Sequence, residues 1–97
     1  MTEPADSVRI DVWLWRARFL KTRPLACAFV ERGAVRLTRG GQETRLDKPS
    51  RTVRPGDQLT FALAGRVSTI RVEALGERRG PASEAQELYT RLDDASA

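Results

Sequence analysis

The period of the hydrophobic residues changes once along this chain, and that change constrains its fold more than any other feature. From Ile10 to Val30, apolar residues recur three and four positions apart, which is typical of amphipathic helices. From Val35 to Val72 they alternate with polar residues, which is typical of strands with one buried face. We therefore expect an α+β fold in which two N-terminal helices pack on a small, mostly antiparallel sheet, with a short C-terminal helix.

The first helix is expected to begin after Asp6 or Ser7, with Asp11 as a less favoured cap, and to run to about Phe19. Trp15 lies off its apolar stripe, and we interpret it as a packing residue, with stacking on a nucleic-acid base as the alternative. The residues expected in the core are Ile10, Trp13, Leu14 and Ala17.

The second helix has a start signal and a stop signal. Thr22 is a suitable N-cap, Pro24 is tolerated in the first turn, and Gly33 fits the left-handed position that ends a helix. Its buried side is expected to consist of Leu25, Ala26, Phe29 and Val30.

Two pairs of strands follow. The segments 35–38 and 43–46 form a hairpin around the turn "RGGQ", residues 47–57 form a loop, and 58–64 and 67–76 form two longer strands around a turn at Gly65-Arg66. The last helix is expected to begin at a capping box of Ser83 and Gln86. One side of that helix would carry Ala85, Leu88, Tyr89 and Leu92.

Composition narrows the function classes. The 97 residues are enough for one domain, and neither a long apolar run nor a signal-peptide pattern is present, so we expect a cytoplasmic protein that does not bind membranes. The chain has no histidine and a single cysteine, Cys27, interpreted as a small buried hydrophobic residue. Because no catalytic constellation, phosphate loop or metal-ligand set is found, we expect neither an enzyme nor a cofactor.

Positive charge is concentrated in one half of the chain. Residues 8–54 contain twelve basic and four acidic residues, a net charge of +8, whereas the flanking residues 1–7 and 55–97 are each net negative at −2. Only two of the 17 basic residues are lysine, and guanidinium groups suit bidentate phosphate contacts. This segregation favours a nucleic-acid partner.

The start of the second helix combines cations with an N-terminus that itself carries positive potential. Thr22 and the first helical amides would form an anion site, and the neighbouring cations would serve phosphates that also complement the helix dipole. If the second helix packs beside the hairpin, one continuous phosphate-binding surface results, made by Arg9, Arg16, Lys21, Arg23, Arg39, Arg45, Lys48 and Arg51.

Three linked motifs occur in order over about half of the chain: Arg9-Ile10-Asp11, the run from Lys21 to Val35, and the stretch from Lys48 to Asp57. Together they resemble the RNA-binding domain first described in the fourth protein of the small ribosomal subunit, here called the S-four domain. The stretches "WLWRARFLKTR", "KPS" and "RRGPASEAQELY" extend the resemblance to the ribosome-associated heat-shock protein fifteen family. Two features depart from the family pattern: Val12 follows Asp11 where lysine is frequent, and "TRGGQ" replaces an Asn-Gly turn.

The resemblance implies a division into an N-terminal tail (1–8), an S-four domain (9–76) and a C-terminal extension with a short helix (77–97). It implies that a monomer binds ribosomal RNA of the large subunit and helps under stress to rescue or recycle free large subunits that hold peptidyl-tRNA. Asp11 would orient an arginine. The RNA-binding residues that it implies are Arg9, Arg16, Arg18, Lys21, Thr22, Arg23, Lys48 and Ser50, to which the charge pattern adds Arg39, Arg45 and Arg51.

Three other interpretations stay open. S-four domains also bind other structured RNAs, and they occur attached to RNA-modifying enzymes and transfer-RNA synthetases. Two helices around a basic corner also suggest a DNA-binding module, but the second helix is mostly Ala, Leu and Phe and has few base-reading side chains.

Overall fold

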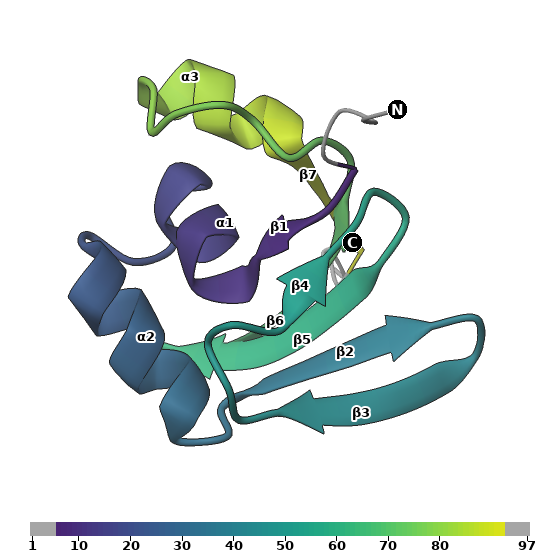
Figure 1. Ribbon diagram of the computed structural model, residues 1–97. Coiled ribbons are helices and arrows are strands. Elements are labelled where there is room, and N and C mark those ends of the chain that lie inside the picture. The colour runs from purple at the N-terminus through teal and green to yellow at the C-terminus, as the bar shows by residue number, and fades with distance from the viewer. Residues whose placement is uncertain (1–5, 93–97) are drawn as a thin grey trace, which may run out of the picture.

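The computed structural model describes residues 6–92. Figure 1 shows the helices on one side of a twisted sheet, with α1 between α2 and α3. All neighbouring strands are antiparallel, and the main sheet has the order β3-β2-β5-β6-β7. The expected α+β fold with two N-terminal helices on an antiparallel sheet is confirmed. The elements are β1 (Val8–Arg9), α1 (Ile10–Arg16), α2 (Arg23–Glu31), β2 (Val35–Arg39), β3 (Gln42–Leu46), β4 (Thr52–Val53), β5 (Gln58–Leu63), β6 (Arg66–Val72), α3 (Ala82–Ala85), the 3-10 turn η1 (Gln86–Leu88) and β7 (Tyr89–Arg91).

One hydrophobic core lies between α1, α2 and the inner face of the sheet. Trp13 is its largest fully buried residue, and the indole Nε1 donates a hydrogen bond of 2.9 Å to the carbonyl oxygen of Ala74. The alternation expected in the two long strands is present, because their inward side chains are buried and the intervening ones face outward. The inward side chains of these strands are Leu59, Phe61, Ser68, Ile70 and Val72.

The first helix is shorter at both ends than the sequence predicts. Val8 and Arg9 form strand β1, which pairs with Val53 and Thr52 of β4, so Arg9 becomes the N-cap. The other end stops because Arg18 adopts a left-handed conformation with φ of +66°, which no helix continues through. Trp15 is half-buried and does not belong to the core cluster, so a position in the core is wrong for it, and the alternative of stacking on a base stays a prediction.

The second helix follows its predicted signals. The Oγ1 of Thr22 accepts a hydrogen bond of 3.1 Å from the amide of Leu25, and Gly33 has φ of +75° immediately beyond the C-cap. Ala26, Phe29 and Val30 are buried as expected, but Leu25 is 51% exposed. Leu25 lies in the first turn of α2, where Arg23 and Pro24 are exposed as well.

The predicted hairpin is present with a two-residue turn at Gly40 and Gly41, whose φ values of +59° and +81° suit the twist of the flanking strands. The second turn is at Ala64-Gly65, one residue earlier than predicted. Residues 47–57 are not all loop, because they contain strand β4.

The C-terminal helix is shorter than predicted. It caps at Pro81 without a side-chain hydrogen bond, so the Ser83–Gln86 capping box is not formed. Tyr89 to Arg91 leave the helix and form β7, because Tyr89 pairs with Val72 at the sheet edge. Residues 1–5 and 93–97 of the predicted tails lie outside the described residues.

Candidate nucleic-acid interface

The start of α2 presents positive charge that no carboxylate of residues 6–92 pairs with. Lys21 and Arg23 are exposed on either side of the Thr22 cap, and the first turn contains no acidic residue. Neither cation forms an ion pair with any residue in the described part of the chain. An anion bound here would meet two cationic side chains, a hydroxyl group and the positive end of the helix dipole.

Arg9 is held in place at the start of α1. Its Nε and Nη2 donate hydrogen bonds of 3.1 and 3.0 Å to the two carboxylate oxygens of Asp11, which is 3% exposed and also accepts from the amide of Val12. The hydrogen bonds with Asp11, and then its negative charge, raise the pKa of the Arg9 guanidinium. Asp11 therefore orients an arginine, as the resemblance implied, and the outer side of that guanidinium stays accessible.

The loop before β4 lies against the start of α1. The amide of Ile10 donates a hydrogen bond of 2.7 Å to the carbonyl oxygen of Arg51, and the amide of Arg51 bonds to the carbonyl oxygen of Lys48 in a tight turn. Lys48, Ser50 and Arg51 are all exposed there. We call the exposed residues of these segments the basic face: Arg9, Lys21, Thr22, Arg23, Lys48, Ser50 and Arg51.

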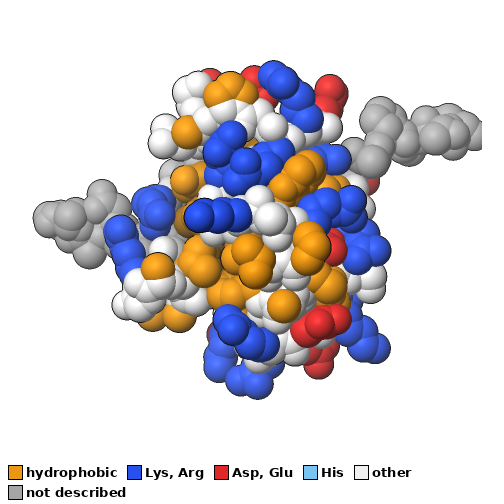
Figure 2. Space-filling model, turned by 90° about the vertical axis from the view of Figure 1, so that its left-hand side faces the viewer, with side chains coloured by type: hydrophobic (Ala, Val, Ile, Leu, Met, Phe, Trp, Pro, Cys, Tyr) orange, Lys and Arg blue, Asp and Glu red, His pale blue; other side chains and the backbone are white. Residues whose placement is uncertain are grey.

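Figure 2 shows lysine and arginine side chains spread over the side of the molecule that carries α1 and α2, with hydrophobic side chains exposed between them. Leu25, which is half-exposed on α2, contributes to that apolar surface. Such a surface can contact phosphates through its cations and sugar or base surfaces through its apolar part.

Arg16 and Arg18 point toward the C-terminal segment. Nη1 of Arg16 donates to the carbonyl oxygens of Gly76 at 2.8 Å and Leu75 at 3.4 Å, and its Nε is buried with no hydrogen-bond partner among the described residues. Nε of Arg18 donates to the carbonyl oxygen of Gly80 at 2.7 Å. These hydrogen bonds hold the chain after β6 against α1 and the corner that follows it, so both guanidiniums are partly engaged inside the protein. Their role in RNA binding stays a prediction.

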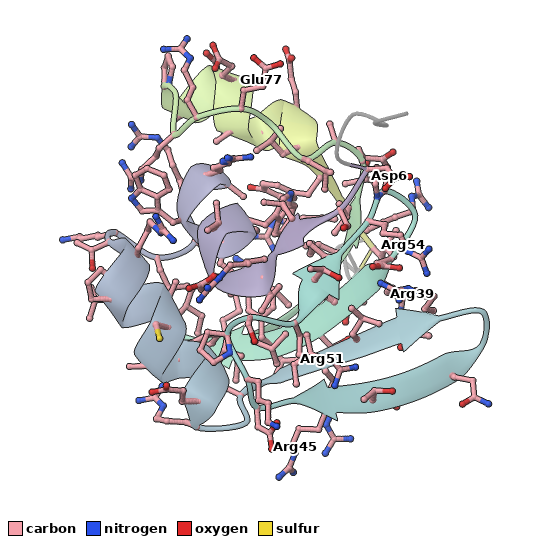
Figure 3. All side chains as sticks on the ribbon, in the orientation of Figure 1. Asp6, Arg39, Arg45, Arg51, Arg54 and Glu77 are labelled. Atoms are coloured by element: carbon pink, nitrogen blue, oxygen red, sulfur yellow. The ribbon has the colours of Figure 1, made fainter. Side chains whose placement is uncertain are left out.

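Arg39 lies at the far end of the hairpin and also has a partner inside the protein. Its Nε and Nη2 donate to the two carboxylate oxygens of Asp57 at 2.8 and 2.7 Å, and the hydrogen bonds raise the pKa of the Arg39 guanidinium. Asp57 is 3% exposed and also accepts from the amide of Arg54. Figure 3 shows Arg39 beside Arg54, apart from Arg45 and Arg51.

Arg45 is directly opposite Arg36 in the β2–β3 pair, a like-charged arrangement that weakens a hairpin unless an anion is near. Glu43 pairs with Arg36 at 3.1 Å, but Arg45 forms no ion pair within residues 6–92. The RNA-binding residues expected from the sequence did not include Arg36. The two-residue turn at Gly40-Gly41 fixes the register, and counting back from that turn would have placed the two arginines opposite each other.

Two features are absent from the described residues: a cluster of metal ligands and a membrane-spanning helix. Within them, no three His, Cys, Asp or Glu side chains are placed to share a metal ion. None of the helices in that part of the chain has the length and hydropathy of a membrane span.

Comparisons with known proteins agree with this geometry. No family model matches the chain. Heat shock protein 15 of Escherichia coli is 45% identical over 87 residues, which are 90% of this chain and 62% of that protein, so the chain spans less than two thirds of that relative. The RQC P-site tRNA stabilizing factor of Listeria innocua is 30% identical over 90 residues, which are 93% of this chain and 91% of that protein.

A solved structure, described as a trimeric structure of Vibrio cholerae heat shock protein 15, superposes with a TM-score of 0.79 at 41% identity, covering 93% of this chain and 86% of that one. The sequence identity and the superposition both extend over about nine tenths of this chain. The chain belongs to the heat shock protein 15 family, with the S-four type of RNA-binding fold.

Proposed function

We propose that the chain binds structured RNA of the large ribosomal subunit through its basic face and acts on free large subunits that carry peptidyl-tRNA. The observation that carries this proposal is the start of α2, where Lys21, Thr22 and Arg23 form an exposed cationic site with no counter-charge among the residues that the structure describes. Relatives that include the RQC P-site tRNA stabilizing factors support the tRNA-associated part of the role.

The same proposal describes a non-catalytic, cytoplasmic protein of the heat-shock response. The names of its relatives denote a heat shock protein and a stabilizing factor, not an enzyme. We propose that residues 9–76 are the RNA-binding unit and residues 77–97 its extension. The monomeric state also stays a proposal, since the related Vibrio cholerae protein is described as trimeric.

Duplex DNA is the competing partner class. The exposed residues of α2 include Pro24, Leu25 and Ala28, which offer no hydrogen bonds to base edges, so α2 is not suited to reading the major groove. A shape-reading and phosphate-reading surface suits folded RNA better.

A direct binding titration tests the proposal. Large-subunit RNA fragments and duplex DNA of equal length are titrated with the wild-type protein at several salt concentrations, and with the double variant Lys21→Gln/Arg23→Gln. We expect tighter binding to the RNA, and a salt slope that falls by about 1.4–1.8 in the variant, because two phosphate contacts are lost.

The matched control is Arg66→Gln/Arg78→Gln, which removes the same charge from two exposed positions outside the basic face. Equal losses in both double variants would show that net charge alone drives binding. Equal affinity of the wild type for RNA and DNA would contradict the RNA assignment.

A further inference from the structure

Two cavities flank the segment α3–η1, and their charges differ. The first, of about 170 Å³, is lined by three carboxylates, Glu77, Glu84 and Glu87, besides Arg16 and Arg78. The second, of about 260 Å³, lies between the corner after α1 and the α3–η1 segment, and its lining contains Arg18 and Arg91 but no carboxylate. Only the second cavity therefore suits an anionic ligand.

The walls of this second cavity are aromatic and held by the core. The Phe19 ring contacts the ring of Tyr89 at 4.7 Å between centroids and that of Phe61 at 5.0 Å. Tyr89 is fixed by its backbone pairing with Val72 in the sheet. Both Phe19 and Tyr89 are half-buried, so each ring keeps surface available to a ligand without having to move.

The polar groups of the cavity are also positioned before any ligand arrives. Arg18 has φ of +66°, and its Nε is bound to the carbonyl oxygen of Gly80, which fixes the direction of the guanidinium. Its Nη atoms make no hydrogen bond within the described residues. Gln86, on the opposite wall, is exposed and carries an amide that can both donate and accept.

We propose that this cavity binds one unpaired nucleotide of the RNA that the basic face holds. The base would lie against Phe19 and Tyr89, the amide of Gln86 would meet the base edge, and Arg18 would meet the phosphate. The cavity is smaller than the 300–1,000 Å³ typical of pockets for drug-sized ligands, which fits a single base. This inference rests on the proposed function and adds a single-stranded element to the RNA that is recognised.

The test compares two RNAs that differ by one nucleotide: a blunt duplex, and the same duplex with one unpaired nucleotide at a 3′ end. We expect the wild type to bind the second RNA roughly 5- to 150-fold more tightly, the range for stacking one base on aromatic side chains. Ala82→Phe fills the cavity from an exposed position of α3 and should abolish this difference while leaving blunt-duplex binding intact. Ser83→Phe, the next residue along and outside both cavities, is the matched control and should keep the difference.

Equal binding of the two RNAs by the wild type would overturn the cavity proposal and leave the proposed function standing. A difference that persists in Ala82→Phe would overturn it as well. Failure of the wild type to bind either RNA would contradict the proposed function. In that case, adenosine 5′-monophosphate, titrated into the wild type and followed by NMR at the side-chain amide of Gln86, decides the cavity on its own: a saturable shift supports it, and no shift overturns it.

Discussion

Asp11 and Asp57 are the two buried carboxylates of the described residues, and each binds an arginine through both oxygens. Each carboxylate also accepts a backbone amide. A buried carboxylate keeps its charge only when such partners replace the water that it loses. The charge pattern does not distinguish Arg9 from Arg39, and the structure gives each a buried carboxylate partner. Arg9 lies at the start of α1, whereas Arg39 lies at the end of β2, where its Nη2 also donates to the carbonyl oxygen of Thr52 at 3.5 Å.

Asp57→Ala should lower the free energy of unfolding by about 1–3 kcal/mol, because Arg39 and the amide of Arg54 lose charge-assisted hydrogen bonds. Urea unfolding followed by circular dichroism measures this. Glu43→Ala, which breaks the exposed pair with Arg36, is the control and should change stability by less than about 1 kcal/mol. If the two substitutions lowered the free energy of unfolding equally, the buried ion pair of Asp57 would contribute no more to stability than the exposed pair of Glu43.

Cys27 is half-buried, not fully buried as expected, and its Sγ lies 3.7 Å from a carboxylate oxygen of Glu31. Desolvation, and then the charge of Glu31, raise the pKa of the thiol. At pH 8 less thiolate is present than in an unperturbed thiol, so alkylation by iodoacetamide should be slower than that of a free cysteine. Glu31→Gln should speed the reaction, and an unchanged rate would contradict the role of Glu31.

At the scale of elements, helix α2 is the part that the sequence predicts best. A single hydrogen bond from the amide of Leu25 to Thr22 caps its exposed N-terminus. Thr22→Ala should therefore lower the free energy of unfolding by about 0.5–2 kcal/mol in thermal or urea unfolding, and Thr22→Ser should restore most of it. If serine were as destabilising as alanine, the methyl group of Thr22 and not its hydroxyl would be responsible.

The docking of the C-terminal segment depends on arginine side chains. Arg16 bonds to the carbonyl oxygens of Leu75 and Gly76, and Arg79 bonds back to the carbonyl oxygen of Trp15. Arg16→Gln should loosen this segment and speed amide hydrogen exchange of Glu73 and Ala74, which bond to Leu88, by roughly 2- to 10-fold.

The amide of Ala26 in α2 is the internal control for Arg16→Gln, and its exchange should not change. Uniform acceleration of both regions would indicate global destabilisation. Unchanged exchange of Ala74 would contradict the docking role of Arg16.

Local signals explain which elements could be predicted. Thr22, Pro24 and Gly33 define α2, and the two glycines of the hairpin turn define its register, because each residue acts on the backbone within a few positions of itself. Strands β1 and β4 have only two residues each and produce no periodic pattern. Tyr89 continues a helical pattern in sequence, but pairing with the sheet overrides that local preference.

The candidate site could be predicted only in part from the sequence, because charge can be located in a sequence and distant hydrogen-bond partners cannot. The sequence shows where cations are concentrated, and the structure leaves Lys21, Arg23, Lys48 and Arg51 exposed; that they bind RNA as one surface stays a prediction. It contains no sign of the backbone carbonyl groups that Arg16 and Arg18 bind, because those acceptors come from residues about sixty positions away.

At the scale of the whole molecule, the fold separates the charges as the sequence does. The basic face is built from the start of α1, the start of α2 and the loop before β4, whereas the C-terminal segment adds Glu77, Glu84 and Glu87 around one cavity. Long-range attraction to a polyanion would therefore act mainly on the basic face.

The measurement that tests this account most directly is sedimentation of the tagged 97-residue chain in a cell lysate through a sucrose gradient that resolves free large subunits, small subunits and intact ribosomes. The account predicts that the wild type and Arg66→Gln/Arg78→Gln comigrate with free large subunits, and that Lys21→Gln/Arg23→Gln remains at the top of the gradient. Comigration of Lys21→Gln/Arg23→Gln at the wild-type level, or wild-type protein absent from the large-subunit fractions, would contradict it.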